Sequence, residues 1–117
     1  LLFVFMHGGA FEAGFIAVLN VFTTSILLSL MLIYTQGLAV PILMHFIWNC
    51  IGRLVGVVSL AEDYPVLFDS YVSGSSMLSG GDIKIEGSII VLIFNSLLIL
   101  STVVYYNRKN NKVKKTD

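Results

Sequence analysis

The amino-acid sequence predicts an all-α protein, a polytopic bundle of transmembrane helices. Of its 117 residues, 56% are hydrophobic and 12% are charged, and the mean hydropathy is +0.89. Soluble domains carry about 25% charged residues, so this composition suits lipid better than water. No charged residue occurs from Ala13 to Ile33 or from Ser88 to Tyr106. Runs of roughly twenty such residues have the length that a helix needs to cross about 30 Å of hydrocarbon.

About three full spans are predicted after a truncated N-terminal helix. The predicted helices cover Leu1 to about Phe11, Ala13 to about Tyr34, about Leu38 to Leu60, and Ser88 to Tyr106. Gly37 is typical of a helix end, and Pro41 is tolerated in a first turn. Residues 1–117 are interpreted as the C-terminal part of a single membrane-embedded domain, with an extramembrane loop at 61–87 and a basic tail at 107–117.

The charges indicate an orientation. The tail carries five basic residues, and the loop has one lysine against five acids; the residues are Arg108, Lys109, Lys112, Lys114 and Lys115 in the tail, and Lys84, Glu62, Asp63, Asp69, Asp82 and Glu86 in the loop. By the positive-inside rule the C-terminus is cytoplasmic. The Ile-, Asn- and Lys-rich composition points to a prokaryotic cell membrane.

Polar side chains inside the apolar runs are the candidate functional residues. Inserting an ionisable side chain into the membrane within a spanning helix costs at least about 2.5–3.5 kcal/mol of free energy. The presence of His7, His45 and Arg53 in the apolar runs therefore indicates a function for these residues. His45, Asn49 and Arg53 share one helix face, because residues four apart lie on the same side. We expect His7 to meet this face. Hydrogen bonding between helices is the simpler explanation of such a pair.

Two imidazoles and an amide can bind a metal or hold and polarise a substrate carbonyl. Zinc takes histidine nitrogen readily, but asparagine is a weak ligand. A hydrolase would also need a carboxylate to take a proton from water. The acid nearest in the chain to a candidate histidine, Glu12, matches no familiar spacing. Ser88, Asn95 and Thr102 recur every seven residues and are interpreted as packing contacts of the last helix.

Three stretches of the sequence contain short motifs. "FVFMH" (Phe3 to His7) has the pattern FxxxH, "HFIWN" (His45 to Asn49) has the pattern HxxxN, and "SGGDIKIEGSII" (Ser79 to Ile90) leads into the last predicted helix. The first two resemble motifs of the CPBP family, and the third resembles the stretch that opens the last helix in many of its members. That family contains the type II CAAX prenyl endopeptidases and the bacterial proteins linked to bacteriocin processing and self-immunity.

The resemblance implies a membrane-embedded endopeptidase that hydrolyses peptide bonds with a glutamate-activated water. His7, His45 and Asn49 would be its catalytic residues, as ligands of a divalent metal such as zinc or as oxyanion stabilisers. The expected partners are the lipid bilayer and a peptide or protein substrate, without nucleic acid. The family's upstream EExxxR motif, with the general-base glutamate, is absent, so we interpret the chain as a fragment that is inactive alone.

Two alternatives remain, and one geometric difficulty. The chain could be a non-enzymatic bacteriocin-immunity or accessory membrane protein, or His7 and His45 could be axial haem ligands. If the span from Ala13 to Tyr34 crosses fully, His7 lies near its outer end and His45 enters from the cytoplasmic side. Each would be roughly 10 Å deep in about 30 Å of hydrocarbon, so they would not meet unless that helix is broken, tilted or partly inserted.

Overall fold

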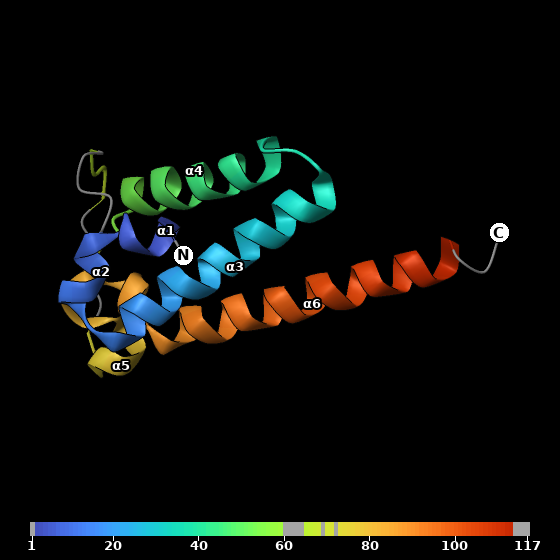
Figure 1. The fold of residues 1–117 in the computed structure, drawn as a ribbon. Helices are drawn as coiled ribbons and strands as arrows, with labels where there is room; N and C mark the ends of the chain where they lie inside the picture. The colour runs from blue at the N-terminus through green and yellow to red at the C-terminus, as the bar shows by residue number, and fades with distance from the viewer. Residues whose placement is uncertain (1, 60–64, 69, 72, 114–117) are drawn as a thin grey trace.

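Helices build the described part of the chain, and three of them are long and apolar (Figure 1). The computed structural model describes residues 2–59, 65–68, 70, 71 and 73–113. In chain order the elements are α1 (Leu2–Phe5), α2 (Gly8–Ala13), α3 (Phe15–Thr35), α4 (Ala39–Leu54), α5 (Ser76–Ser79), the 3₁₀ helices η1 (Gly81–Ile83) and η2 (Ile85–Gly87), and α6 (Ile89–Val113). The predicted all-α class is confirmed.

Two of these helices are long and apolar enough to cross a membrane. They are α3, with 21 residues, and the Ile89–Asn111 part of α6, with 23 residues. The third apolar helix, α4, has 16 residues. At 1.5 Å per residue α4 is about 24 Å long, shorter than the roughly 30 Å of hydrocarbon in a typical bilayer.

The helix predicted over about 38–60 ends at Leu54, earlier than expected. The Val57 N–H donates to the Gly52 carbonyl at 2.9 Å, which turns the chain away from the helix axis. Gly56 has φ 73°, a left-handed conformation that glycine adopts without steric cost. This turn closes the helix and starts the loop. Leu60 lies outside the described residues.

α3 and α6 lie side by side and run in the same direction (Figure 1). α4, which follows α3 in the chain, runs in the opposite direction and returns the chain toward the end where α6 begins. Asn95, which is buried, donates through its side-chain amide to the hydroxyls of Thr23 and Thr24 at 3.3 and 3.0 Å. Farther along, the rings of Tyr34 and Tyr106 stack with their centroids 3.7 Å apart. The packing role predicted for Asn95 is confirmed.

The predicted N-terminal helix is two short helices, α1 and α2, which meet at His7. Both pack against α3, and α1 lies back along it. Phe3 reaches a small cleft of about 150 Å³ that Ser25 and Ser29 in the middle of α3 also line. Residues 8–14 therefore fill the distance between His7 and the start of α3. The depth difficulty disappears without a break in α3, because His7 is not at the end of that helix.

The loop between α4 and α6 folds against the start of α3. The Asn20 side chain is 4% exposed, and its amide donates to the main-chain carbonyls of Glu86 and Ser88 at 2.8 and 2.9 Å. The Ser88 hydroxyl accepts the Ile90 N–H at 3.1 Å, as an N-cap of α6. One buried α3 side chain thus fixes the entry to the last helix.

Gly80 is required where the chain turns between α5 and η1. Its φ is 85°, and a Cβ added there would collide with the Lys84 carbonyl. An isolated antiparallel bridge between Val58 and Lys84 ties this turn to the segment after α4.

Parts of the predicted loop and tail are not covered by the structure. Glu62, Asp63, Asp69, Lys114 and Lys115 lie outside the described residues. The cytoplasmic position of the C-terminus stays a prediction.

Candidate functional site

The structure brings His7, His45 and Asn49 together. His7 lies at the junction of α1 and α2, and the other two residues lie on α4. The imidazole centroids of His7 and His45 are 5.7 Å apart. The Asn49 side-chain amide nitrogen lies 3.0 Å from His45 Nε2. All three side chains are half-buried. The meeting that we expected between His7 and the polar face is confirmed.

The short helix α1 fixes one ring. His7 Nδ1 lies 2.7 Å from the Phe3 carbonyl oxygen. A carbonyl can only accept, so Nδ1 carries the hydrogen and a neutral His7 presents a bare Nε2. The junction at His7 turns the ring back onto α1, because the residue has left the helical geometry, with φ −99° and ψ 57°.

The second ring is fixed by its neighbour one turn later. An amide nitrogen can only donate, so His45 Nε2 accepts from Asn49, and a neutral His45 carries its hydrogen on Nδ1. The i, i+4 spacing on α4 makes this contact possible. The pair of imidazoles therefore presents one acceptor nitrogen, on His7, and one donor nitrogen, on His45.

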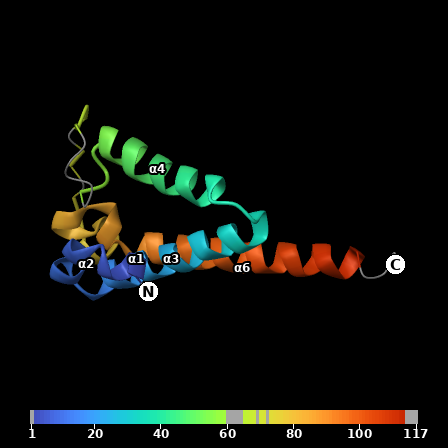
Figure 2. The ribbon, with the colours of Figure 1, turned by 45° about the horizontal axis from the view of Figure 1, so that its top comes forward.

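An apolar cavity of about 270 Å³ lies beside His45. Its walls come from α3, α4 and α6, and its lining is Thr24, Leu27, Leu28, Met44, His45, Ile47, Trp48, Phe94, Asn95 and Leu98. Figure 2 shows α4 leaning away from α3 toward its C-terminal end. The cavity gives an apolar group a place in contact with a polarising side chain, which is the usual composition of a ligand site.

Arg53 continues the polar face of α4 but takes part in the turn that follows it. Its guanidinium Nη1 lies 3.4 Å from the Val58 carbonyl. Arg53 thus supports the loop where α4 ends, as expected for a structural arginine at the end of an apolar helix.

The donor set does not make a metal site by itself. In the ranges that the structure describes, no group of three His, Cys, Asp or Glu side chains could hold a metal ion. His45 Nε2 already accepts a hydrogen bond, which leaves His7 Nε2 as the one bare imidazole nitrogen of the pair. A catalytic zinc takes three protein ligands, and this set supplies fewer.

Two acids of the described part have other roles or positions. The Glu86 carboxylate accepts the Ser59 N–H at 2.8 Å, which holds the loop to the segment after α4. The Glu12 side chain is exposed on α2.

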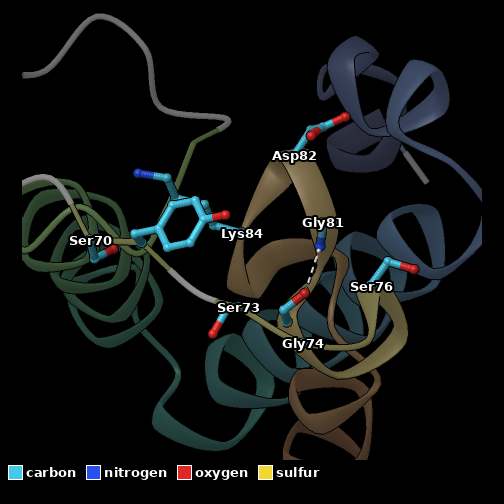
Figure 3. Close-up of a pocket in the computed structure, with 9 residues that line it drawn as sticks. Ser70, Ser73, Gly74, Ser76, Gly81, Asp82 and Lys84 are labelled. Atoms are coloured by element: carbon cyan, nitrogen blue, oxygen red, sulfur yellow. Dashed lines mark hydrogen bonds between the residues drawn. The ribbon is translucent and has the colours of Figure 1, made fainter.

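A second, polar pocket of about 400 Å³ lies in the loop (Figure 3). It is lined by Ser70, Tyr71, Ser73, Gly74, Ser76, Ser79, Gly81, Asp82 and Lys84. The Lys84 ammonium donates to the Gly56 carbonyl at 2.7 Å, so this lysine holds the loop to the end of α4. The pocket shares no lining residue with the histidine site.

Sequence reasoning missed the role of Asn20 and the contact of Phe3 with the second imidazole. Asn20 anchors the loop, and Phe3 contacts both imidazoles, with ring centroids 4.3 Å from His7 and 5.1 Å from His45. An amide inside an apolar run is a signal that could have identified Asn20. Phe3 is the first residue of FxxxH, but that motif does not indicate that its ring also contacts His45 on α4.

Comparison with known proteins supports the resemblance over part of the chain. Residues 1–51 match the family described as "Rce1-like: Type II CAAX prenyl endopeptidase Rce1-like". This stretch contains FxxxH and HxxxN, and the glycine-rich stretch before α6 lies beyond it. No curated protein and no solved structure matches the chain.

Proposed function

Since residues 1–51 match the type II CAAX prenyl endopeptidase Rce1-like family and the apolar helices make this an integral membrane protein, we propose that the chain is the His/His/Asn part of a membrane-embedded endopeptidase. One observation carries the proposal. The His7 imidazole, from the N-terminal segment, lies 5.7 Å between ring centroids from His45 of α4, and His45 is held by Asn49 at 3.0 Å and lines an apolar cavity.

The two imidazoles have different roles in this proposal. His45, held by Asn49, donates its Nδ1–H to the carbonyl oxygen of the scissile peptide, where negative charge develops during attack. His7 Nε2 accepts a hydrogen bond from the attacking water and orients it, while the general-base glutamate takes the water's proton and delivers it to the amine that leaves. The general-base glutamate comes from a further part of the protein, so residues 1–117 do not hydrolyse peptides alone. The divalent metal stays a prediction, because the donors present do not complete its ligand set.

The proposed substrate is a peptide with a prenylated C-terminus, as the name of the matching family indicates. Its apolar chain would occupy the cavity beside His45, because burying that chain removes apolar surface from water and lipid headgroups. Trp48, the one tryptophan of the chain, lines this cavity. Titration with a farnesylated peptide should change Trp48 fluorescence, and the same peptide without the prenyl group should not. Equal responses to both peptides would contradict the assignment of the cavity.

Hydrolysis tests the enzymatic part of the proposal. The product of the complete reading frame is placed in vesicles with an internally quenched prenylated peptide. His45→Ala should lower the rate by about 10²–10³-fold, the usual cost of one oxyanion donor. Phe46→Ala is a matched control, because its ring is on the same helix, 55% exposed and outside the cavity lining. Equal rates for His45→Ala and wild type would refute the role of His45.

A non-enzymatic immunity or accessory protein is the second candidate. It is favoured by the absence of a carboxylate grouped with the two histidines in the described part of the chain. The reading frame upstream of Leu1 separates the candidates. Two adjacent glutamates on an apolar helix support the enzyme, and a frame without them supports the accessory role.

We also propose a prokaryotic cell membrane as the location, with the C-terminus in the cytoplasm. A cytoplasm-specific reporter fused after Asp117 should be active, and a reporter that needs an oxidising compartment should be inactive.

A further inference from the structure

Three aromatic rings form one cluster at the candidate site. Phe3 lies 4.3 Å from His7 and 5.1 Å from His45, between ring centroids, and the two imidazoles are 5.7 Å apart. Phe3 meets His45 edge-on, with an interplanar angle of 60°. Aromatic rings at such distances favour a few relative orientations, because their quadrupoles attract edge to face. Phe3 thus restricts both imidazoles at once.

The main chain of the same residue restricts His7 a second time. The Phe3 carbonyl accepts the His7 Nδ1–H at 2.7 Å. This hydrogen bond selects the tautomer of His7 that leaves Nε2 bare, and it holds the ring in one plane. The ring and the main-chain carbonyl of Phe3 both contact the His7 imidazole, so a shift of Phe3 would change both contacts.

Phe3 is itself held by the helices around it. It lines a cleft of about 150 Å³ with Ser25, Leu28, Ser29, Leu32, Leu38 and Pro41. These residues belong to α3, to the turn after it and to the first turn of α4. Phe3 therefore connects the imidazole pair to the corner where α3 and α4 join.

We propose that Phe3 is a positioning residue for His7 and His45, which sets their relative orientation through its ring and the His7 tautomer through its carbonyl. This inference rests on the proposed function for its effect on hydrolysis. Its structural part is independent of that function. A misplacement of reacting groups by about 1 Å can cost on the order of 10²-fold in rate.

Nuclear magnetic resonance of the protein labelled with ¹⁵N-histidine in lipid nanodiscs tests the structural part. The chain has two histidines, so two sets of imidazole signals are expected. Above about pH 8, where an ordinary imidazole is neutral, His7 should show the Nδ1–H tautomer. Phe3→Leu should move the ring-proton signals of both histidines, and Phe3→Tyr should restore them. An Nε2–H tautomer for His7, or unchanged signals in Phe3→Leu, would overturn the inference.

The matched control is Phe5→Leu. Phe5 belongs to the same short helix, but it is 70% exposed and its ring stacks on Phe11 instead. Its substitution should leave the histidine signals in place. If Phe5→Leu moves them as much as Phe3→Leu does, α1 has unfolded and the positioning role of Phe3 is refuted.

Hydrolysis of the prenylated peptide tests the functional part. Phe3→Leu should lower kcat by about 10–10²-fold with a smaller change in KM, because orientation rather than binding is lost. Phe3→Tyr should recover most of the rate. If Phe3→Leu moves the histidine ring-proton signals but leaves kcat unchanged, the positioning role in hydrolysis is refuted. A wild-type protein without hydrolysis would refute the proposed function, and the spectra would still decide whether Phe3 orients the rings.

Discussion

Asn49 determines which nitrogen of His45 carries a hydrogen, through the 3.0 Å contact between its amide and Nε2. Asn49→Ala removes that donor, so His45 can adopt either tautomer and either ring orientation. We expect the hydrolysis rate to fall by about 10²-fold, since His45, the oxyanion donor in the proposed function, is no longer held. The rate on a prenylated peptide in vesicles measures this.

Asn107→Ala is the control for this substitution. Asn107 is exposed on α6, so its removal should leave the rate within experimental error of wild type. If both variants lose the same activity, the loss in Asn49→Ala does not come from its contact with His45, and the prediction is wrong.

Asn20 affects stability rather than chemistry. Asn20→Ala leaves the carbonyls of Glu86 and Ser88 without the donor that now serves both. One hydrogen bond contributes about 0.5–1.5 kcal/mol, so the loss of two should lower the free energy of unfolding by about 1–3 kcal/mol. Unfolding in mixed micelles, followed by Trp48 fluorescence, gives the value. Ser96→Ala should have little effect, because Ser96 is exposed and its hydroxyl bonds only within α6.

Single residues show what sequence reasoning can and cannot predict. His45 and Asn49 were identified correctly as neighbours because a helix fixes the relation of residues four apart. The contact of Phe3 with His45 joins residues 42 positions apart, and no local pattern encodes it. The roles of His7, His45 and Asn49 in catalysis remain predictions.

At the scale of elements, apolar runs without charges located α3 and the start of α6 within two residues, because hydrocarbon thickness sets a minimum length. The predicted end of α6 at Tyr106 was wrong, since the helix continues to Val113, into the predicted basic tail. Helix ends were harder to predict. α4 stops at Leu54 although apolar residues continue, since Gly56 allows a turn that the apolar pattern does not register. The N-terminal helix is divided at His7, whose φ of −99° and ψ of 57° are not helical.

The turn at Gly80 gives a prediction at this scale. Gly80→Ala places a methyl group against the Lys84 carbonyl in a backbone conformation that alanine disfavours. We expect a loss of about 1–3 kcal/mol in stability, the usual cost of such strain. The same unfolding measurement checks it. Gly74→Ala separates steric from conformational cost, because Gly74 has φ 131° but no atom near its added Cβ; it should cost less.

At the scale of the whole molecule, the candidate site depends on the packing of three long helices, because α3, α4 and α6 all line the cavity beside His45. The sequence predicted that the histidines would face each other but placed them at different depths. His7 reaches His45 because α1 packs back along α3, and this packing depends on contacts between residues more than twenty positions apart. Such contacts follow from tertiary packing and not from hydrophobic periodicity.

Because α4 is short, we expect the thickness of the bilayer to affect the candidate site. A helix of about 24 Å in about 30 Å of hydrocarbon requires the bilayer to thin around it or the helix ends to be drawn inward. A thinner bilayer should bring water closer to His45. Hydrolysis should therefore be faster in vesicles of short-chain phosphatidylcholine than in long-chain vesicles. Equal rates across chain lengths, at equal protein content, would contradict this expectation.

The parallel course of α3 and α6 also has an electrical consequence. In the proposed topology α3, α4 and α6 each cross the membrane, and α4 returns the chain to the face where α3 begins, so the loop and the tail face different compartments. The exposed Asp82 belongs to one face, and the exposed Arg108 and Lys109 belong to the other. In that topology these charges give the protein a dipole along the membrane normal. In the proposed orientation, the interior-negative potential of an energised cell attracts the basic end inward and opposes inversion of the protein.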